Sequence, residues 1–219
     1  MTDVDARGFG AAQFGDRFAV SRETLQALEL YAERLLAWQQ RINLISQTTA
    51  PDAWWRHFAD SAQLVDVLPE ITAAPRDRSP ILADIGSGAG FPGLVIGLMR
   101  PMFHVKLIES NAKKAAFLQE IVARTGAGNV EILRERAEKL KGWTADIITA
   151  RACASLGGLL DMTDTIRRPD TVCLFLKGET AQRELTEARE EWKITVDSTP
   201  SVTNPDSVIL KISEVYRVR

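Results

Sequence analysis

Three glycines and two carboxylates form the pattern with the clearest chemical meaning. Gly86, Gly88 and Gly90 alternate with small residues, Asp84 precedes them by two positions, and Glu109 follows about 20 residues later. A loop with so few Cβ atoms turns tightly and lets backbone N–H groups approach a ligand. In nucleoside-binding α/β units, an acidic side chain at about this separation along the sequence binds the ribose hydroxyls. A plain turn or a solvated carboxylate explains either feature alone, so only the pair predicts a nucleoside-cofactor site.

The segments around this pattern are those that hold such a loop at the end of a parallel sheet. Ile81–Ile85 and His104–Ile108 are short apolar runs, typical of strands buried on both faces. Pro92 suits the first turn of a helix that ends before Pro101. The order strand, glycine loop, helix, strand therefore predicts an α/β unit that binds its ligand at the carboxyl ends of the strands.

The rest of the chain continues the alternation of helices and strands. Periodicity predicts helices at 21–40, 51–68, 111–125, 155–168 and 179–192, and strands at 130–133, 146–150, 171–176, 193–196 and 208–215. We expect a loosely ordered N-terminus at 1–20, an N-terminal helical extension and linker at 21–80, and an α/β core at 81–219. Together these form one globular unit, in which the last two strands suit an antiparallel edge.

Composition restricts the possible functions. The chain has 219 residues, of which 45% are hydrophobic, and a net charge of −2, so contact with nucleic acid requires a local basic patch. We expect no membrane span and no signal peptide, because the sequence lacks an apolar run of about 18 residues. Cys153, Cys173, His57 and His104 do not form a zinc pattern. We therefore expect a cytoplasmic monomer with reduced thiols and no metal.

Longer motifs carry a family resemblance. The Asp-x-Gly-x-Gly-x-Gly string at 84–90 resembles the first motif of the S-adenosylmethionine-dependent methyltransferases. With the next three residues, and with Arg-His-Phe-Ala-Asp-Ser at 56–61, it resembles the RsmG (GidB) family, bacterial enzymes that methylate N7 of one guanine in small-subunit ribosomal RNA. The resemblance runs from about 35 to 177 and includes the motifs at 113–118, 136–138 and 151–152.

The resemblance implies a fold, a reaction and a partner. The fold is a seven-stranded, mostly parallel class I S-adenosylmethionine-dependent methyltransferase (Rossmann-like) fold with an N-terminal helical extension. The reaction transfers a methyl group from S-adenosyl-L-methionine to N7 of a guanine in 16S ribosomal RNA, by resemblance guanine 527 of the 530 loop. The RNA is expected within a small subunit or an assembly intermediate. A class I methyltransferase acting on another RNA base, a small molecule or a protein stays an alternative.

Three groups of candidate site residues follow from the motifs and the resemblance. Cofactor binding is expected from nine residues: Asp84, Gly86, Gly88, Gly90, Phe91, Glu109, Ala137, Glu138 and Arg151. Arg151, His57 and Asp60 are the candidate catalytic residues, acting by orientation. RNA contact is expected from Arg56, Lys113, Lys114, Arg136 and Lys177. Purely structural roles, as a polar packing cluster, a surface ion pair or solvated charges, stay open for the last two groups.

Residues after the expected fourth strand distinguish classes of methyl acceptor. Guanine N7 has an exposed lone pair and needs no deprotonation, so orientation can supply most of the catalysis. Exocyclic-amine methylation commonly uses an Asn/Asp-Pro-Pro-aromatic string, whereas this chain has Arg151, Ala152, Cys153 and Ala154 there. Cytosine C5 chemistry needs a cysteine nucleophile. Cys153 has small apolar neighbours, so we interpret it as a packed thiol.

Overall fold

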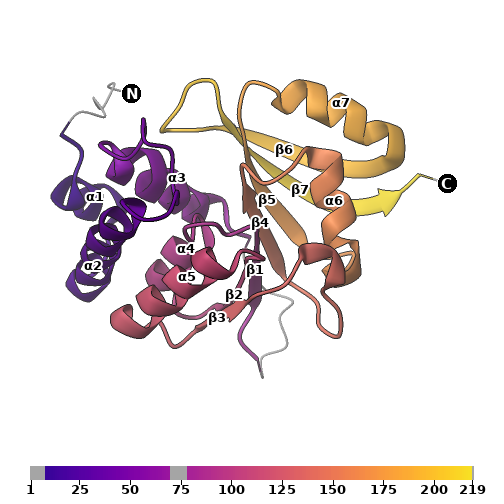
Figure 1. Ribbon diagram of the computed structural model, residues 1–219. Coiled ribbons are helices and arrows are strands. Elements are labelled where there is room, and N and C mark those ends of the chain that lie inside the picture. The colour runs from indigo at the N-terminus through magenta and orange to yellow at the C-terminus, as the bar shows by residue number, and fades with distance from the viewer. Residues whose placement is uncertain (1–7, 70–77, 219) are drawn as a thin grey trace.

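A seven-stranded sheet forms the centre of the protein (Figure 1). The structure is a computed structural model that describes residues 8–69 and 78–218. The strands are β1 (Ile81–Ile85), β2 (His104–Ile108), β3 (Val130–Leu133), β4 (Ile147–Arg151), β5 (Val172–Lys177), β6 (Trp192–Pro200) and β7 (Val208–Arg217). Their order is β3-β2-β1-β4-β5-β7-β6; β1 to β5 run parallel, and β7 pairs antiparallel with β5 and β6. The predicted seven-stranded, mostly parallel sheet is confirmed.

Helices cover both faces of the sheet. The helices α2 (Arg22–Gln39), α4 (Gly93–Met99) and α5 (Ala112–Thr125) lie on one face, and α6 (Leu156–Thr163) and α7 (Ala181–Glu191) on the other (Figure 1). Successive strand residues point to opposite faces. Leu82 accordingly joins the core under α2, α4 and α5, whereas Ala83 joins the core under α6 and α7.

The N-terminal extension is less regular than the sequence predicts. Residues 51–68 form a π-helical turn, η1 (Trp54–Ala59), the short α3 (Asp60–Ala62) and a 3-10 helix, η2 (Gln63–Val67). The expected helix over 155–168 likewise ends at Thr163 and continues as the 3-10 helix η4 (Asp164–Ile166). In the expected linker, residues 70–77 lie outside the described residues.

The expectation of a loose N-terminus does not hold for the segment before α2. Residues 11–18 form a helix, α1 (Ala11–Phe18), and Phe14 is fully buried. The ring of Phe14 packs 5.4 Å from Trp54, and the ring of Phe9 packs 4.8 Å from Trp55, measured between centroids. These aromatic contacts order the segment, although its glycine and alanine content suggested that it would be loosely ordered. Residues 1–7 lie outside the described residues.

A buried carboxylate joins the amino ends of three strands. Asp146, just before β4, accepts hydrogen bonds from the backbone N–H of Ile81 (2.7 Å) and from the guanidinium groups of Arg78 (2.8 Å) and Arg168 (2.7 Å). Burial alone raises the pKa of Asp146, but the hydrogen bonds from both arginines outweigh it and lower that pKa to about 2. The charged form of Asp146 therefore stabilises the fold.

The Asp146→Asn variant should lower the free energy of unfolding at pH 7 by about 2 kcal/mol. A carboxylate whose pKa is depressed by folding stabilises above the unfolded-state pKa near 4 and loses that effect as pH falls toward 2, so the difference should shrink below pH 4. Urea unfolding at pH 7 and pH 3.5 measures it. Asp161→Asn is the control, because its ion pair with Arg217 is half exposed. Equal losses in both variants would contradict the assignment.

Candidate functional site

Two cavities open beside the glycine loop at the carboxyl ends of the strands. The larger, of about 610 Å³, lies between the loop, the N-terminal extension and the ends of β4 and β5. The smaller, of about 240 Å³, lies at the ends of β1, β2 and β3 and is lined by Glu109, Ala137 and Glu138 among others. Gly86 lines both cavities. This edge is where open α/β sheets bind their ligands.

The glycine loop presents bare backbone to the larger cavity. Gly88 has a φ of +59°, a conformation that side chains rarely adopt, and a Cβ added there would meet no heavy atom closer than 3.7 Å. A Cβ at Gly90 would instead lie 2.7 Å from the hydroxyl of Tyr31, and one at Gly86 would lie 2.4 Å from Sγ of Cys153. Packing therefore requires glycine at Gly90, a φ of +65° favours glycine at Gly86, and at Gly88 there is open space for a ligand.

Glu109 holds the loop from the side of the smaller cavity. One carboxylate oxygen accepts a hydrogen bond from the backbone N–H of Gly88 (2.9 Å), and the other accepts from Asn111 (2.6 Å). The side chain is buried, yet it borders the smaller cavity together with Ala137 and Glu138. This position leaves its predicted contact with a ribose possible, and that contact stays a prediction.

Asp84 lies beneath the loop and lines neither cavity. Its side chain is fully buried, and Oδ1 accepts a hydrogen bond from the Thr149 hydroxyl (2.8 Å). Its Oδ2 atom is buried and has no hydrogen-bond partner among the described residues. Burial raises the pKa of Asp84 to about 6. The structure thus places this candidate under the glycine loop, where the hydroxyl of Ser87 also donates to the carbonyl oxygen of Asp84 (2.9 Å).

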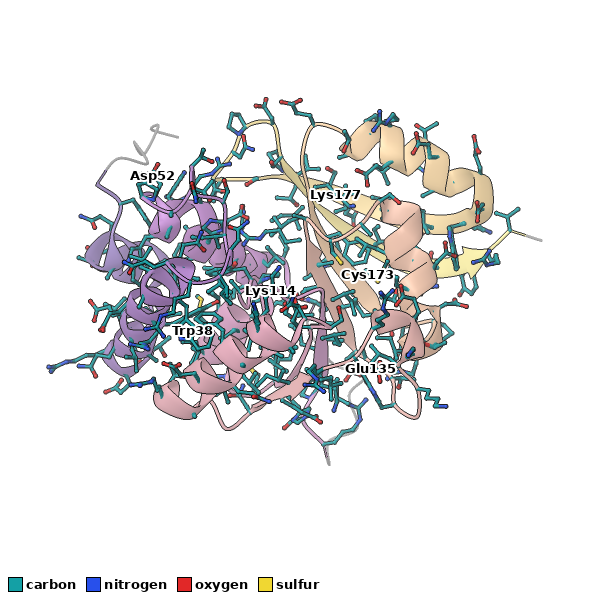
Figure 2. All side chains as sticks on the ribbon, viewed as in Figure 1. Trp38, Asp52, Lys114, Glu135, Cys173 and Lys177 are labelled. Carbon is teal, nitrogen blue, oxygen red and sulfur yellow. The ribbon has the colours of Figure 1, made fainter. Side chains whose placement is uncertain are left out.

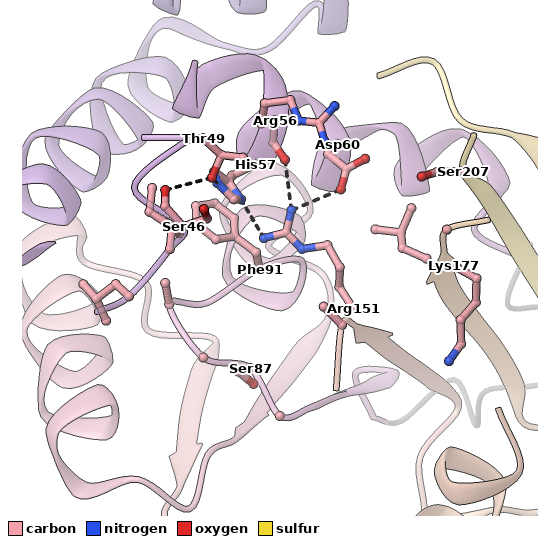
Figure 3. A pocket seen from close by; sticks show the side chains of 18 of the residues that line it. Ser46, Thr49, Arg56, His57, Asp60, Ser87, Phe91, Arg151, Lys177 and Ser207 are labelled. Atoms are coloured by element: carbon pink, nitrogen blue, oxygen red, sulfur yellow. Dashed lines mark hydrogen bonds and ion pairs between the residues drawn. The ribbon is translucent and has the colours of Figure 1, made fainter. Parts of the chain in front are cut away.

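Arg151 joins the candidate catalytic residues at the end of β4 (Figure 3). Its guanidinium donates to Oδ2 of Asp60 (3.1 Å), to the carbonyl oxygen of Arg56 (3.1 Å) and to Nδ1 of His57 (3.0 Å). It also lies over the ring of Phe91, 5.0 Å from the centroid. His57, Asp60 and Arg151 are therefore in direct contact at the larger cavity, which all three line together with Phe91.

His57 is held in one neutral form. Its Nδ1 accepts from a guanidinium that is always charged, so the ring proton lies on Nε2 and is donated to the hydroxyl of Thr49 (2.8 Å). Burial and the charge of Arg151 lower the pKa of His57 to about 3. At neutral pH His57 is uncharged, and its acceptor nitrogen is already occupied.

The candidate RNA-binding cations fall into two groups. Arg56 and Lys114 line the larger cavity, Arg136 lines the smaller one, and Lys113 is exposed at the start of α5. Lys177 is different, although it also lines the larger cavity: it is buried, and its ammonium donates to Ala154 O (2.6 Å) and to Glu184 (2.8 Å). Figure 2 shows Lys114 on α5 and Lys177 at the end of β5.

The place of Lys177 corrects an expectation from the sequence. We expected it to contact RNA, but its side chain is buried and its charge is paired internally with Glu184 of α7. The sequence does not show that the Glu184 carboxylate turns toward the sheet.

Comparison with known proteins identifies the family. Residues 24–209 match the profile of the family described as GidB, rRNA small subunit methyltransferase G. The chain belongs to this family. A relative named ribosomal RNA small subunit methyltransferase G in Rhodospirillum centenum is 45% identical over 98% of this chain and 95% of its own. Its counterpart in Paramagnetospirillum magneticum is 44% identical over 96% of this chain and 98% of its own.

A solved structure confirms the class I methyltransferase fold. An Aquifex aeolicus protein described as a SAM-dependent methyltransferase superposes with a TM-score of 0.54 at 15% identity, covering 74% of this chain and 92% of that one. At this level of identity the likeness concerns the fold alone. The family predicted from the glycine motif and from residues 56–61 is thus confirmed by the GidB match.

Tyr31 is a residue of the GidB site region that sequence reasoning missed. Its hydroxyl donates to the carbonyl oxygen of Ala89 in the glycine loop, and its ring stacks on Phe91 with centroids 5.3 Å apart. Tyr31 lies on the apolar face of α2, where the sequence pattern cannot tell a core tyrosine from one that supports a loop. The N-terminal extension therefore helps to shape the glycine loop.

Cys153 also differs from expectation. We interpreted it as a packed thiol, but the residue is exposed and borders the smaller cavity of this GidB-family chain. Its partial burial and the carboxylates of Asp84 and Glu109 raise the pKa of the Cys153 thiol. The thiol is therefore protonated at neutral pH, unlike an activated cysteine nucleophile.

No helix in residues 8–69 and 78–218 has both the length and the apolar character needed to cross a bilayer. Within the same residues, no three His, Cys, Asp or Glu side chains converge in a way that could hold a metal ion.

Gly88→Ala should weaken binding of S-adenosylmethionine at least tenfold, because the new methyl group would occupy open space at the cavity. The positive φ also carries a strain of about 1 kcal/mol. Gly126→Ala is the matched control, since Gly126 has a φ of +68°, no neighbour within 4 Å and a place at the end of α5. Calorimetry should find a loss of affinity in Gly88→Ala alone; equal affinities in both variants would exclude ligand contact at Gly88.

Proposed function

We propose that this protein transfers a methyl group from S-adenosylmethionine to N7 of a guanine in 16S ribosomal RNA. The observation that carries the proposal is the glycine loop between two cavities, with Arg151 at the strand end beside it, in a chain of the GidB family. When bound, S-adenosylmethionine supplies an electrophilic methyl group on its sulfonium sulfur. Membership of the family supports the ribosomal RNA substrate, and the arrangement of the site supports the choice of a ring nitrogen.

The residues around Gly86 fit such a cofactor. Gly86 and Gly88 offer bare backbone, and the smaller cavity offers the Glu109 carboxylate for ribose hydroxyls and the segment at Ala137 and Glu138 for the base. Asp84 and Gly90 act from beneath, by holding the loop in shape. The predicted cofactor-binding residues thus divide into those that border a cavity and those that support the loop.

The larger cavity suits an acceptor that needs no base. Methylation at an exocyclic amine or a hydroxyl requires removal of a proton, whereas guanine N7 attacks with a free lone pair. His57 borders the cavity, but its Nδ1 accepts from Arg151 and its pKa of about 3 disfavours proton uptake. The task left to Arg151, His57 and Asp60 is to hold acceptor and methyl group in line, in a site with little water.

Contact with the RNA backbone would come from cations at the rim of the cavity. Arg56 and Lys114 border the larger cavity, Arg136 borders the smaller one, and Lys113 is exposed beside them on α5. These four positive charges beside the two cavities can bind phosphates although the chain carries a net charge of −2. We propose that a monomer acts on the RNA within a small subunit or an assembly intermediate.

The product should carry its methyl group at one guanine N7. N7-methylguanine has a labile glycosidic bond, so reduction and mild aniline treatment should cut the modified 16S RNA at a single position. Arg151→Ala should lower methyl transfer by at least tenfold, because the acceptor then loses its main orienting group. Cys153→Ser should keep most of the activity, because no covalent adduct with the base is required. RNA that resists cleavage, or an inactive Cys153→Ser beside a fully active Arg151→Ala, would overturn the N7 mechanism.

Removing both Lys113 and Lys114 should weaken RNA binding and flatten its salt dependence. Each lost phosphate contact should reduce the slope of log K against log salt concentration by about 0.7 to 0.9. Lys193→Ala is the control, because Lys193 is exposed on β6, the edge strand farthest in the sheet order from β3. Filter binding between 50 and 300 mM salt would measure the slopes. A slope unchanged by the double substitution would remove α5 from the RNA-binding surface.

A further inference from the structure

Arg151 is restrained by a residue that lies outside the cavity. We propose that Thr203, in the loop between β6 and β7, is a positioning residue for methyl transfer, whose hydroxyl orients Asp60 and thereby the guanidinium of Arg151. This inference rests on the proposed function, because it assigns the role of Thr203 in that reaction. Thr203 does not line the larger cavity, so it acts through Asp60 rather than on the substrate.

The contacts form a short chain from the loop to the guanidinium. The Thr203 hydroxyl donates to Oδ1 of Asp60 (2.5 Å), and Oδ2 of Asp60 accepts from Arg151 (3.1 Å). The amide of Gln63 donates to the same Oδ1 atom from 2.9 Å, but it is shared with two other acceptors, so the shorter bond from Thr203 is the stronger restraint on the rotation of the carboxylate. The side chains of Asp60 and Arg151 are 14% and 17% exposed, so solvent screens their ion pair only weakly.

The loop that carries Thr203 is anchored to the N-terminal extension. The indole of Trp55 donates to the carbonyl oxygen of Thr203 (3.2 Å), and the amide of Gln63 donates to the Ser201 hydroxyl (3.1 Å). The backbone N–H of Val202 donates in turn to Gln63 (2.9 Å). In Figure 1 the β6–β7 loop reaches from the sheet across to the helices before β1. Thr203 is buried, so its hydroxyl has a fixed environment.

Loss of this hydroxyl should leave the fold intact. Oδ1 of Asp60 also accepts from the amide of Gln63 (2.9 Å), so the carboxylate keeps a donor on each oxygen in a Thr203→Val protein. The change removes one restraint on Asp60 and therefore loosens Arg151. Since the reaction depends on alignment, a looser Arg151 should slow methyl transfer more than it weakens binding.

The experiment compares three variants in methyl transfer to 16S RNA. Thr203→Val should lower kcat by about tenfold with a KM for RNA within about twofold of the wild type, and Thr203→Ser should restore kcat because it keeps the hydroxyl. Thr171→Val is the matched control. Thr171 is buried like Thr203, and its hydroxyl donates to the carbonyl oxygen of Ala145 (2.6 Å). Thr171 precedes β5 at the amino end of that strand and lines neither cavity. Thr171→Val should lose stability without losing kcat.

Nitrogen-15 NMR of the imidazole rings gives a readout that does not depend on activity. The chain has two histidines, and only His57 accepts a hydrogen bond from Arg151, so His104 is an internal reference. The Nδ1 resonance of His57 should shift in Thr203→Val and stay in place in Thr171→Val. A wild type that transfers no methyl group to RNA would overturn the proposed function, while the NMR result would still decide the role of Thr203. An unchanged His57 resonance in Thr203→Val, or a fall of kcat in Thr171→Val as large as that in Thr203→Val, would overturn this inference.

Discussion

The partly buried guanidinium of Arg151 is the group on which the site depends. A cation taken largely out of water must find acceptors, and Arg151 finds them in a carboxylate, a backbone carbonyl and an imidazole, all from η1 and the first residue of α3. The strand end alone supplies none of these. The larger cavity therefore exists only because the N-terminal extension packs over the ends of β4 and β5.

The same extension also shapes the glycine loop. Phe91 follows the loop and is covered by Tyr31, His57 and Arg151, with centroid or cation distances between 5.0 and 5.3 Å. The ring is 3% exposed, so it forms the floor of the cavity rather than a free surface for stacking a base. The glycine loop, the larger cavity and the N-terminal extension thus share one packed aromatic cluster around Phe91. The cores of the extension and of one sheet face are continuous.

Most of the fold could be predicted because its signals are local. The five parallel strands are short, mostly apolar runs, and β1, β2 and β3 have the bounds that the sequence predicts. The helix α5 begins one residue after its predicted start, where Asn111 caps it, and ends before Gly126. The aromatic contacts that order α1 and the irregular turns of η1 and η2 arise between segments far apart in sequence, and periodicity carries no information about them.

The site, like the fold, has features that local sequence patterns predict and features that depend on contacts between distant segments. The sequence pattern singled out Gly86, Glu109, His57, Asp60 and Arg151, and the structure brings the last three into contact. It did not show that Lys177 turns inward to Glu184, that Cys153 is exposed, or that Tyr31 supports the loop. Each of these depends on which way a side chain points at a junction between elements.

The position of β7 between β5 and β6 has a consequence for biosynthesis. Domains generally fold as units, and the ribosome synthesises the N-terminal part of each chain first. A nascent chain that has released β1 to β5 already contains the glycine loop, Glu109 and Arg151, but it lacks the β6–β7 loop that braces Asp60. The hairpin of β6 and β7 therefore supplies the Thr203 contact to Asp60 only after the glycine loop and Arg151 have been synthesised.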